Sequence, residues 1–221
     1  MLSLMKRHYD GVSPEAFRAD LAEKDDVLLF SAGGRLIGFS TIFCRRLPWL
    51  GNATFLFSGD TVVERDWWGG SFLQMAFGRY VLAVKLRNLT RPVYWMLISK
   101  AYKTYMMMRR NYPWSFPQHA RTTPDAIQRV LTGFYAWKYP GAFDPHNGTI
   151  RLNEGGYTVC TGLAEPDESA AGDPDVRYFL ERNPGWNRGE ELACLAEIRL
   201  VDYLPILRKY VPRYVRSLVH R

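Results

Sequence analysis

The sequence has few cysteines and no long apolar run. Cys44, Cys160 and Cys194 are odd in number and far apart, so they form neither a disulfide framework nor a metal-ligand cluster and are typical of a reducing compartment. No apolar run approaches the ~20 residues that a membrane span needs, and the chain does not open with a basic segment followed by an apolar one. The sequence therefore predicts a cytoplasmic protein that has no metal site and is not an integral membrane protein.

Acidic residues are missing from a long central stretch, residues 67–124, which we call the basic block. It contains no Asp or Glu, and its positive charges are Arg79, Lys85, Arg87, Arg91, Lys100, Lys103, Arg109, Arg110 and Arg121. The whole chain has a net charge of +7, so the remainder is slightly acidic. The basic block is therefore either a solvated cationic face or a site for a polyanion, such as a phosphorylated cofactor, an acidic carrier protein or nucleic acid.

The composition is that of an ordinary globular domain. Hydrophobic residues make up 47% of the 221 residues and charged residues 23%, which leaves enough apolar material for one core or two small ones. The first half is expected to begin with a helix from Pro14 to Glu23 that Ser13 caps, followed by a hairpin over 27–43 that turns at Gly33 and Gly34. A strand over 52–63 follows, with Gly59 as a candidate bulge. We then expect a helix over 72–89, a buried strand over 93–98, and a helix over 100–110 that Ser99 caps.

The second half has weaker patterns and no recognised motif. No internal repeat or low-complexity tract occurs in the chain. We expect a helix that begins at Thr123-Pro124-Asp125 and ends near Trp137, a turn over 144–148, short strands over 149–152 and 157–161, a helix over 174–181, a strand over 191–198, and a basic helix over 201–218.

A glycine-containing turn, Trp68-Gly69-Gly70-Ser71, joins the strand over 52–63 to the helix over 72–89. Such a turn leaves backbone N–H groups free to face an anion, and the helix dipole adds partial positive charge. A glycine pair alone is more often a simple turn. The preceding strand, the following helix and the start of the basic block at this point add weight to phosphate binding.

This order of elements resembles the GNAT superfamily of N-acyltransferases over about Pro14 to Pro113. The family loop, Gln/Arg-x-x-Gly-x-Gly/Ala, is similar to residues 66–71, where Gly69 matches and Asp66 departs from the pattern. The resemblance implies a pyrophosphate site at Trp68, Gly69, Gly70 and Ser71, a strand at Val62 and Val63 that pairs with a pantetheine arm, and Ser99 at the place of a family Asn.

The resemblance also implies an α+β fold, with a GNAT-like central mixed, mostly antiparallel sheet flanked by helices and a C-terminal α/β extension. Residues 1–120 would be the acyl-donor-binding core, and residues 121–221 would complete the sheet and the acceptor pocket in one compact unit. Bulky residues at Trp67, Trp68, Trp95 and 106–108 resemble the long-chain N-acyl-amino-acid-synthase and acyl-homoserine-lactone-synthase branches. They imply a medium or long acyl group, carried by coenzyme A or by the phosphopantetheine of an acyl carrier protein.

The implied chemistry is attack of an amine on a thioester. The acceptor would be an amino acid, a polyamine or a peptide Lys or Orn side chain. Amine attack needs a base, an oxyanion donor such as a bulged-strand amide, and an acid for the departing thiolate. Asp60 and Glu64 are the base candidates, and Tyr105 and Tyr102 are the acid candidates. Asp60 could equally be a turn residue, Glu64 a solvated acid, and the two tyrosines core-edge residues.

Two further alternatives remain open. His119 is either a surface histidine or a base on the substrate side. The whole chain is either the enzyme described above or a non-enzymatic module, a degenerate GNAT fold or a polyanion binder that uses the basic block. Much of that block is expected to be amphipathic helix and buried strand, and no nucleic-acid motif is present. Nucleic acid is therefore not expected as a partner.

Overall fold

The computed structural model describes all residues except 11, 69–71, 152–157, 160–169, 171 and 204–221. Its helices are α1 (Leu2–His8), α2 (Pro14–Ala22), α3 (Phe72–Arg87), α4 (Tyr102–Asn111), α5 (Asp125–Lys138) and α7 (Pro174–Arg182), with 3-10 turns η1 (Arg65–Trp67), η2 (Trp186–Arg188) and η3 (Leu200–Tyr203). Its strands are β1 (Tyr9–Asp10), β2 (Asp26–Ala32), β3 (Arg35–Leu47), β4 (Ala53–Val63), β5 (Val93–Ser99), β6 (Ser115–Phe116), β7 (Phe143–Asp144), β8 (Thr149–Ile150), β9 (Thr158–Val159) and β10 (Glu191–Glu197).

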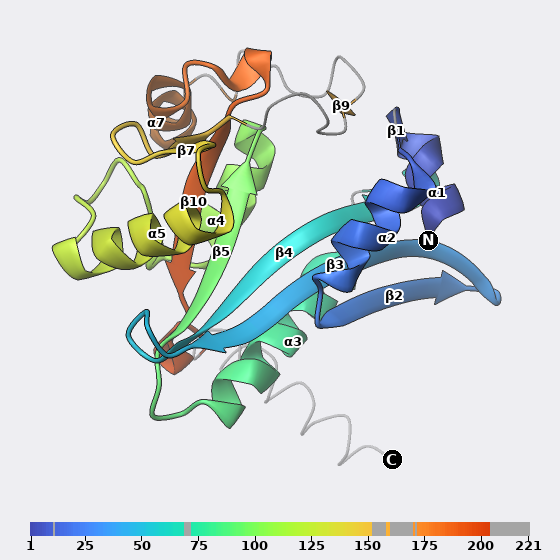
Figure 1. Cartoon of the computed structure of the whole chain (residues 1–221), viewed down its shortest axis with the longest axis horizontal. Coiled ribbons are helices and arrows are strands. Elements are labelled where there is room, and N and C mark those ends of the chain that lie inside the picture. Colours follow the sequence, from blue (N-terminus) through green and yellow to red (C-terminus); the bar gives the residue numbers. More distant parts are fainter. Residues whose placement is uncertain (11, 69–71, 152–157, 160–169, 171, 204–221) are drawn as a thin grey trace, which may run out of the picture.

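The fold is a mixed α+β fold with a mostly antiparallel open sheet, as the sequence predicts. The main sheet has the order β2-β3-β4-β5-β10-β8-β7, and β6 also pairs with β10. Within it, β4 and β5 are parallel, and the other pairs are antiparallel. β10 comes from the second half of the chain and pairs with β5, so both halves contribute to one sheet (Figure 1). None of the described helices is long and apolar enough to cross a membrane.

Two local signals of the first half, the cap at Ser13 and the turn at Gly33 and Gly34, are confirmed. The Ser13 hydroxyl accepts a hydrogen bond from the Ala16 amide and caps α2. Gly33 and Gly34 turn the β2–β3 hairpin with φ angles of 56° and 76°, which L-residues with side chains rarely adopt. These elements are specified by neighbouring residues, so their patterns are readable without the rest of the chain.

Two helix starts differ from the prediction. Ser99 does not cap α4, because it remains in β5 opposite Leu192 and its hydroxyl donates to the Ala101 carbonyl at 2.9 Å. The N-cap of α4 is Ala101, which makes no side-chain cap. The N-cap of α5 is Pro124 instead of Thr123. The predicted helix over 201–218 lies mostly outside the described residues, and its first residues form η3.

Helices cover both faces of the sheet (Figure 1). On one face, α3, α4 and α7 pack on side chains such as Leu56, Trp95 and Cys194. On the other face, α5 packs on Phe43, Phe55 and their neighbours, and α1 and α2 cover the outer part of β3 and β4. This division places the residues of β4 and β5 between two separate apolar clusters.

Gly38 provides a stability test of the β3–β4 pairing. A Cβ at Gly38 would lie 2.9 Å from the Val62 carbonyl oxygen, so we expect Gly38→Ala to lower the free energy of unfolding by about 1–3 kcal/mol. Gly78 in α3 is the matched control, since a Cβ there meets nothing within 4 Å, and Gly78→Ala should raise stability by roughly 0.5–1 kcal/mol. Urea unfolding measures both, and equal effects would contradict the close β3–β4 approach.

Candidate functional site

The parallel pair β4–β5 separates after a short contact. Thr54–Phe57 pair with Val93–Met96, and no pairing follows, although β4 continues to Val63 and β5 to Ser99. Figure 1 shows the two strands diverging from this point. The Trp95 indole N–H donates to the Ser58 hydroxyl at 3.1 Å and joins the strands where the pairing ends. Among the described residues, the edge of β4 that faces β5 therefore has no strand partner beyond Phe57.

A β-bulge lies in β4 at the same level. Ser40 pairs with Thr61 and Ile42 pairs with Ser58, so β4 carries one extra residue at Gly59–Asp60 opposite β3. The bulge predicted at Gly59 is confirmed. It shifts the side-chain alternation, because Phe57 and Val62 are an odd number of residues apart and yet pack against the same side of the sheet.

Asp60 is a half-buried carboxylate within this bulge. Its Oδ2 atom is buried and has no hydrogen-bond partner among the described residues. Burial raises the pKa of Asp60 to about 6, the nearby Asp20 carboxylate adds to the increase, and Lys24 opposes it. Lys24 is itself held in a 2.5 Å ion pair with Asp20 and is nearly buried. A carboxylate with a pKa near neutrality can accept a proton during a reaction.

Glu64, the other base candidate, is held by α1. Its Oε1 accepts a hydrogen bond from Arg7 at 2.5 Å, and His8 lies 3.8 Å from its Oε2. These partners tie the end of β4 to α1. The geometry therefore favours Asp60 over Glu64 as a base.

The two tyrosines of α4 have different surroundings. The side chain of Tyr105 is 1% exposed, its hydroxyl donates to the Pro117 carbonyl at 3.0 Å, and its ring lies 5.5 Å from that of Phe179. Burial raises the pKa of Tyr105 far above its usual value. The hydroxyl of Tyr102 makes no hydrogen bond to any described residue. Tyr102 is also buried, at 7% exposed, so the two tyrosines differ in the hydrogen bond of the hydroxyl and little in burial.

The predicted donor-binding residues are only partly described. Gly69, Gly70 and Ser71 lie outside the described residues. Val62 is buried against α1 and α2, and the Val63 carbonyl accepts a hydrogen bond from the Trp68 indole at 2.8 Å. Ser99 is fully buried. A pantetheine arm carries amide groups that can pair with an open strand edge, and β4 offers such an edge next to the start of α3.

The basic block is not a continuous free cationic surface. Arg109 pairs with Asp175 at 3.2 Å, Arg110 with Asp173 at 3.8 Å, and Lys100 with Glu191 at 3.7 Å. Arg121 instead stacks on Trp114. The acids that pair with the block come from the second half of the chain, so part of its charge is neutralised within the fold.

The bulky residues of the first half divide into two groups. Trp95, Met106 and Met108 are buried and belong to the cluster under α3, α4 and α7. Trp67 and Trp68 are 41% and 48% exposed beside the start of α3. Only the second group forms an apolar surface next to the predicted donor loop.

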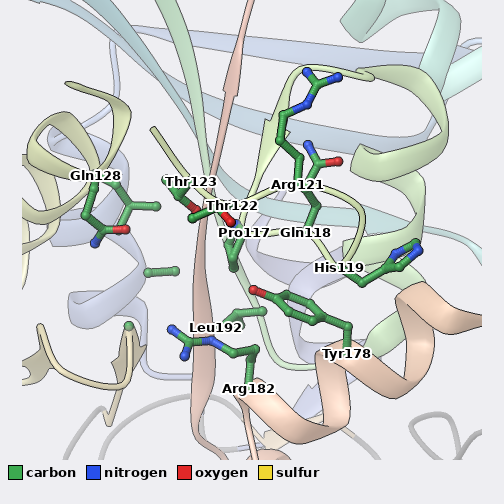
Figure 2. A pocket seen from close by; sticks show the side chains of 13 residues that line it. Pro117, Gln118, His119, Arg121, Thr122, Thr123, Gln128, Tyr178, Arg182 and Leu192 are labelled. Atoms are coloured by element: carbon green, nitrogen blue, oxygen red, sulfur yellow. The ribbon is translucent and has the colours of Figure 1, made fainter. Parts of the chain in front are cut away.

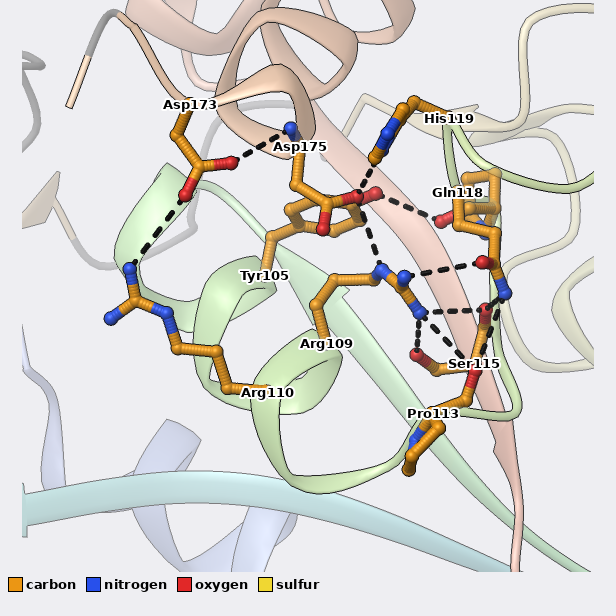
Figure 3. Close-up of polar contacts among 10 residues, drawn as sticks. Tyr105, Arg109, Arg110, Pro113, Ser115, Gln118, His119, Asp173 and Asp175 are labelled. Atoms are coloured by element: carbon orange, nitrogen blue, oxygen red, sulfur yellow. Dashed lines mark hydrogen bonds and ion pairs between the residues drawn. The ribbon is translucent and has the colours of Figure 1, made fainter.

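A polar network that no sequence motif marks surrounds Arg109 (Figure 3). This side chain is 10% exposed, and besides its bond to Asp175 it donates to the Ser115 hydroxyl at 2.9 Å and to the Gln118 side chain at 3.1 Å. The Nδ1 atom of His119 lies 2.9 Å from Asp175. The second half of the chain contains no motif that marks Asp175, so only its contacts show its role.

No protein-family model matches the chain, and no curated protein matches it. Among solved structures, a GNAT-family N-acetyltransferase from Escherichia coli in complex with CoA matches with a TM-score of 0.37 and 12% identity over 50% of this chain and 60% of that chain. A Trypanosoma brucei acetyltransferase matches with a TM-score of 0.35 and 18% identity over 49% of this chain and 75% of that chain. A Mycobacterium tuberculosis protein in complex with CoA matches with a TM-score of 0.41 and 10% identity over 90% of this chain and 92% of that chain. At TM-scores this low, none of these likenesses carries an argument about activity or ligand.

The raised pKa of Asp60 predicts a pH-dependent stability. The folded pKa of about 6 exceeds the ordinary 3.8, so the folded state binds more protons between these values and stability falls as pH rises from about 4 to 6. We expect Asp60→Asn to remove this loss and to be more stable than the parent by about 1–3 kcal/mol at pH 8. Urea unfolding of both proteins from pH 4 to 8 measures the difference. Parallel curves of the free energy of unfolding against pH would contradict the raised pKa of Asp60.

Proposed function

We propose that this protein is a GNAT-like N-acyltransferase that moves an acyl group from a thioester to an amine. The observation that carries the proposal is the early separation of β4 from β5 next to a bulge that holds Asp60. An open strand edge and a carboxylate oxygen without a partner among the described residues adjoin the point of separation. We assign Tyr102, near the end of β5, to the same gap. Coenzyme A or the phosphopantetheine of a carrier protein would present the thioester there.

Asp60 and Tyr102 approach this region from opposite faces of the sheet. Asp60 is near Asp20 and Lys24 on the side of α2, whereas Tyr102 belongs to the cluster with α3, α4 and α7. The amine nitrogen bonds to the thioester carbonyl carbon, the carbon–sulfur bond breaks, Asp60 takes the proton that the nitrogen loses, and Tyr102 gives a proton to the departing sulfur. A backbone N–H of the bulge is the candidate donor to the oxyanion.

The exposed Trp67 and Trp68 support a medium or long acyl group as the substrate. Trp67 lies beside Phe72 at the start of α3, with the two rings 6.4 Å apart, and Trp68 lies beside His8 of α1. Apolar surface of this kind binds an alkyl chain with a free energy that grows by about 0.8 kcal/mol per buried CH₂. An acetyl group offers little such surface, so the preference for longer chains rests on these rings.

Binding of acyl thioesters is the first test. We expect CoA, acetyl-CoA, octanoyl-CoA and palmitoyl-CoA to raise the Tm, and the longer chains to raise it more, because a ligand that binds the folded state stabilises it by mass action. Differential scanning fluorimetry measures the shifts, with an octanoylated carrier protein in a separate arm. A Trp67→Ala, Trp68→Ala double variant should lose the chain-length dependence and keep the response to CoA.

A duplex DNA oligonucleotide serves as the control for general polyanion binding. We expect the protein to bind this DNA only weakly and to lose the binding as the salt concentration rises. If DNA raises the Tm and no thioester does, the protein is a polyanion-binding module and the enzyme proposal is wrong.

The two tyrosines separate a catalytic role from a structural one. We expect Tyr102→Phe to lower kcat for transfer from octanoyl-CoA by about 10²-fold with little change in stability. We expect Tyr105→Phe to keep kcat and to lower the free energy of unfolding by about 1–3 kcal/mol, because the buried Pro117 carbonyl loses its donor. Rates of CoA release with a panel of amino acids, spermidine and lysine peptides measure the first effect. Equal kcat values for both variants and the parent would remove the tyrosine acid from the mechanism.

A further inference from the structure

We propose that a pocket between α5 and α7, at the edge of β10 away from β5, binds the carboxylate of a small organic acid. Its volume is about 350 Å³, which is enough for a small molecule. Leu192 and Ala193 of β10 line it, as do residues of the segment that follows β6. The acyl transfer proposed above does not use this pocket, so the two proposals stand independently.

Two side chains of α7 provide the charged wall of the pocket. Tyr178 and Arg182 are four residues apart and share one face of the helix. Figure 2 shows both extending toward Leu192. Among the described residues, Arg182 has no ion-pair partner and donates one hydrogen bond, to the Asn147 carbonyl at 3.2 Å. Its other N–H groups are free to bind an anion, and the Tyr178 hydroxyl likewise has no bonded partner among those residues.

The opposite wall is polar and uncharged. Thr122, Thr123 and Gln128 lie there, in the segment that leads into α5 and in its first turn (Figure 2). No Asp or Glu is among the described residues that line the pocket. Leu131 and Leu192 add apolar surface. The pocket thus suits a ligand with an anionic head and a short apolar body.

The charge of the pocket favours a carboxylate over a phosphate. Arg121 also lines it, but its guanidinium lies 4.3 Å from the centre of the Trp114 ring, and Figure 2 shows it extending away from Tyr178 and Arg182. Arg182 is therefore the guanidinium that faces Leu192, and the hydroxyl and amide groups around it are neutral. One positive charge with neutral donors matches a monoanion, and a guanidinium binds a carboxylate through two parallel hydrogen bonds.

The Arg109 network holds the walls of the pocket in place. Gln118 lines the pocket and accepts a hydrogen bond from Arg109, which also binds Asp175 in the first turn of α7 (Figure 3). His119, another lining residue, contacts the same carboxylate. The segment after β6 and the helix that carries Tyr178 are thereby fixed to α4. Binding then costs little rearrangement of these elements.

Isothermal titration calorimetry with 4-methylpentanoate tests the proposal. We expect saturable binding at least about tenfold tighter than that of the neutral isostere 4-methylpentanamide and of inorganic phosphate. Arg182→Gln should lower the affinity for 4-methylpentanoate by about tenfold or more. Arg177→Gln is the matched control, because Arg177 is exposed on α7, bonds to the Gly172 carbonyl and does not line the pocket. This variant should bind as the parent does.

Three results would overturn the proposal: amide binding as tight as carboxylate binding, tighter binding of phosphate, or unchanged carboxylate affinity in Arg182→Gln. Circular dichroism checks that the variant is folded. If it is not, Tyr178→Phe replaces it, with an expected loss of about threefold to tenfold, and an unchanged affinity again overturns the proposal. The Tm shift caused by octanoyl-CoA should persist in Arg182→Gln, which separates this site from the acyl-transfer proposal.

Discussion

The short parallel contact between β4 and β5 is the constraint on which the rest of the structure depends. Four residue pairs join the strands, and the bond from Trp95 to Ser58 lies where the pairing ends. The bulge at Gly59–Asp60 then lets β4 follow β3 toward α1 and α2, while β5 continues beside β10. Because a bulge increases local twist and bends its strand, the two halves of the sheet separate there and leave a strand edge open.

The buried polar groups Arg109 and Asp60 differ in whether their burial is compensated by hydrogen bonds. The guanidinium of Arg109 binds Asp175, Ser115 and Gln118, so its burial is compensated and it joins three segments. Asp60 has a buried oxygen to which no residue of the described part of the chain hydrogen-bonds. An uncompensated carboxylate costs stability, and its pKa rises as a result. The first arrangement stabilises the fold, whereas the second is the kind found at reactive sites.

The distribution of charge on the folded protein also depends on tertiary structure. The basic block is free of acids in sequence, yet Asp173, Asp175 and Glu191 lie against it in the fold. These pairs attach α4 to α7, and Lys100, between β5 and α4, to β10. A cationic stretch in a sequence is therefore available to an anion only where the folded chain leaves its charges unpaired, and Lys100, Arg109 and Arg110 are not available in this sense.

The sequence alone determined the elements whose signals are local. The cap at Ser13 and the turn at Gly33 and Gly34 depend on residues within a few positions of one another. A glycine within a strand pattern also marked the bulge at Gly59, although the bulge itself forms against β3. The polar network beside the pocket between α5 and α7 depends on longer separations, because Arg109 and His119 reach Asp175 across 66 and 56 residues. Which tyrosine hydroxyl is hydrogen-bonded, which carboxylate is buried and which arginines are paired within the described part of the chain were decided only by tertiary structure. The reason is that burial and pairing are properties of contacts between distant segments, and a local pattern does not encode them.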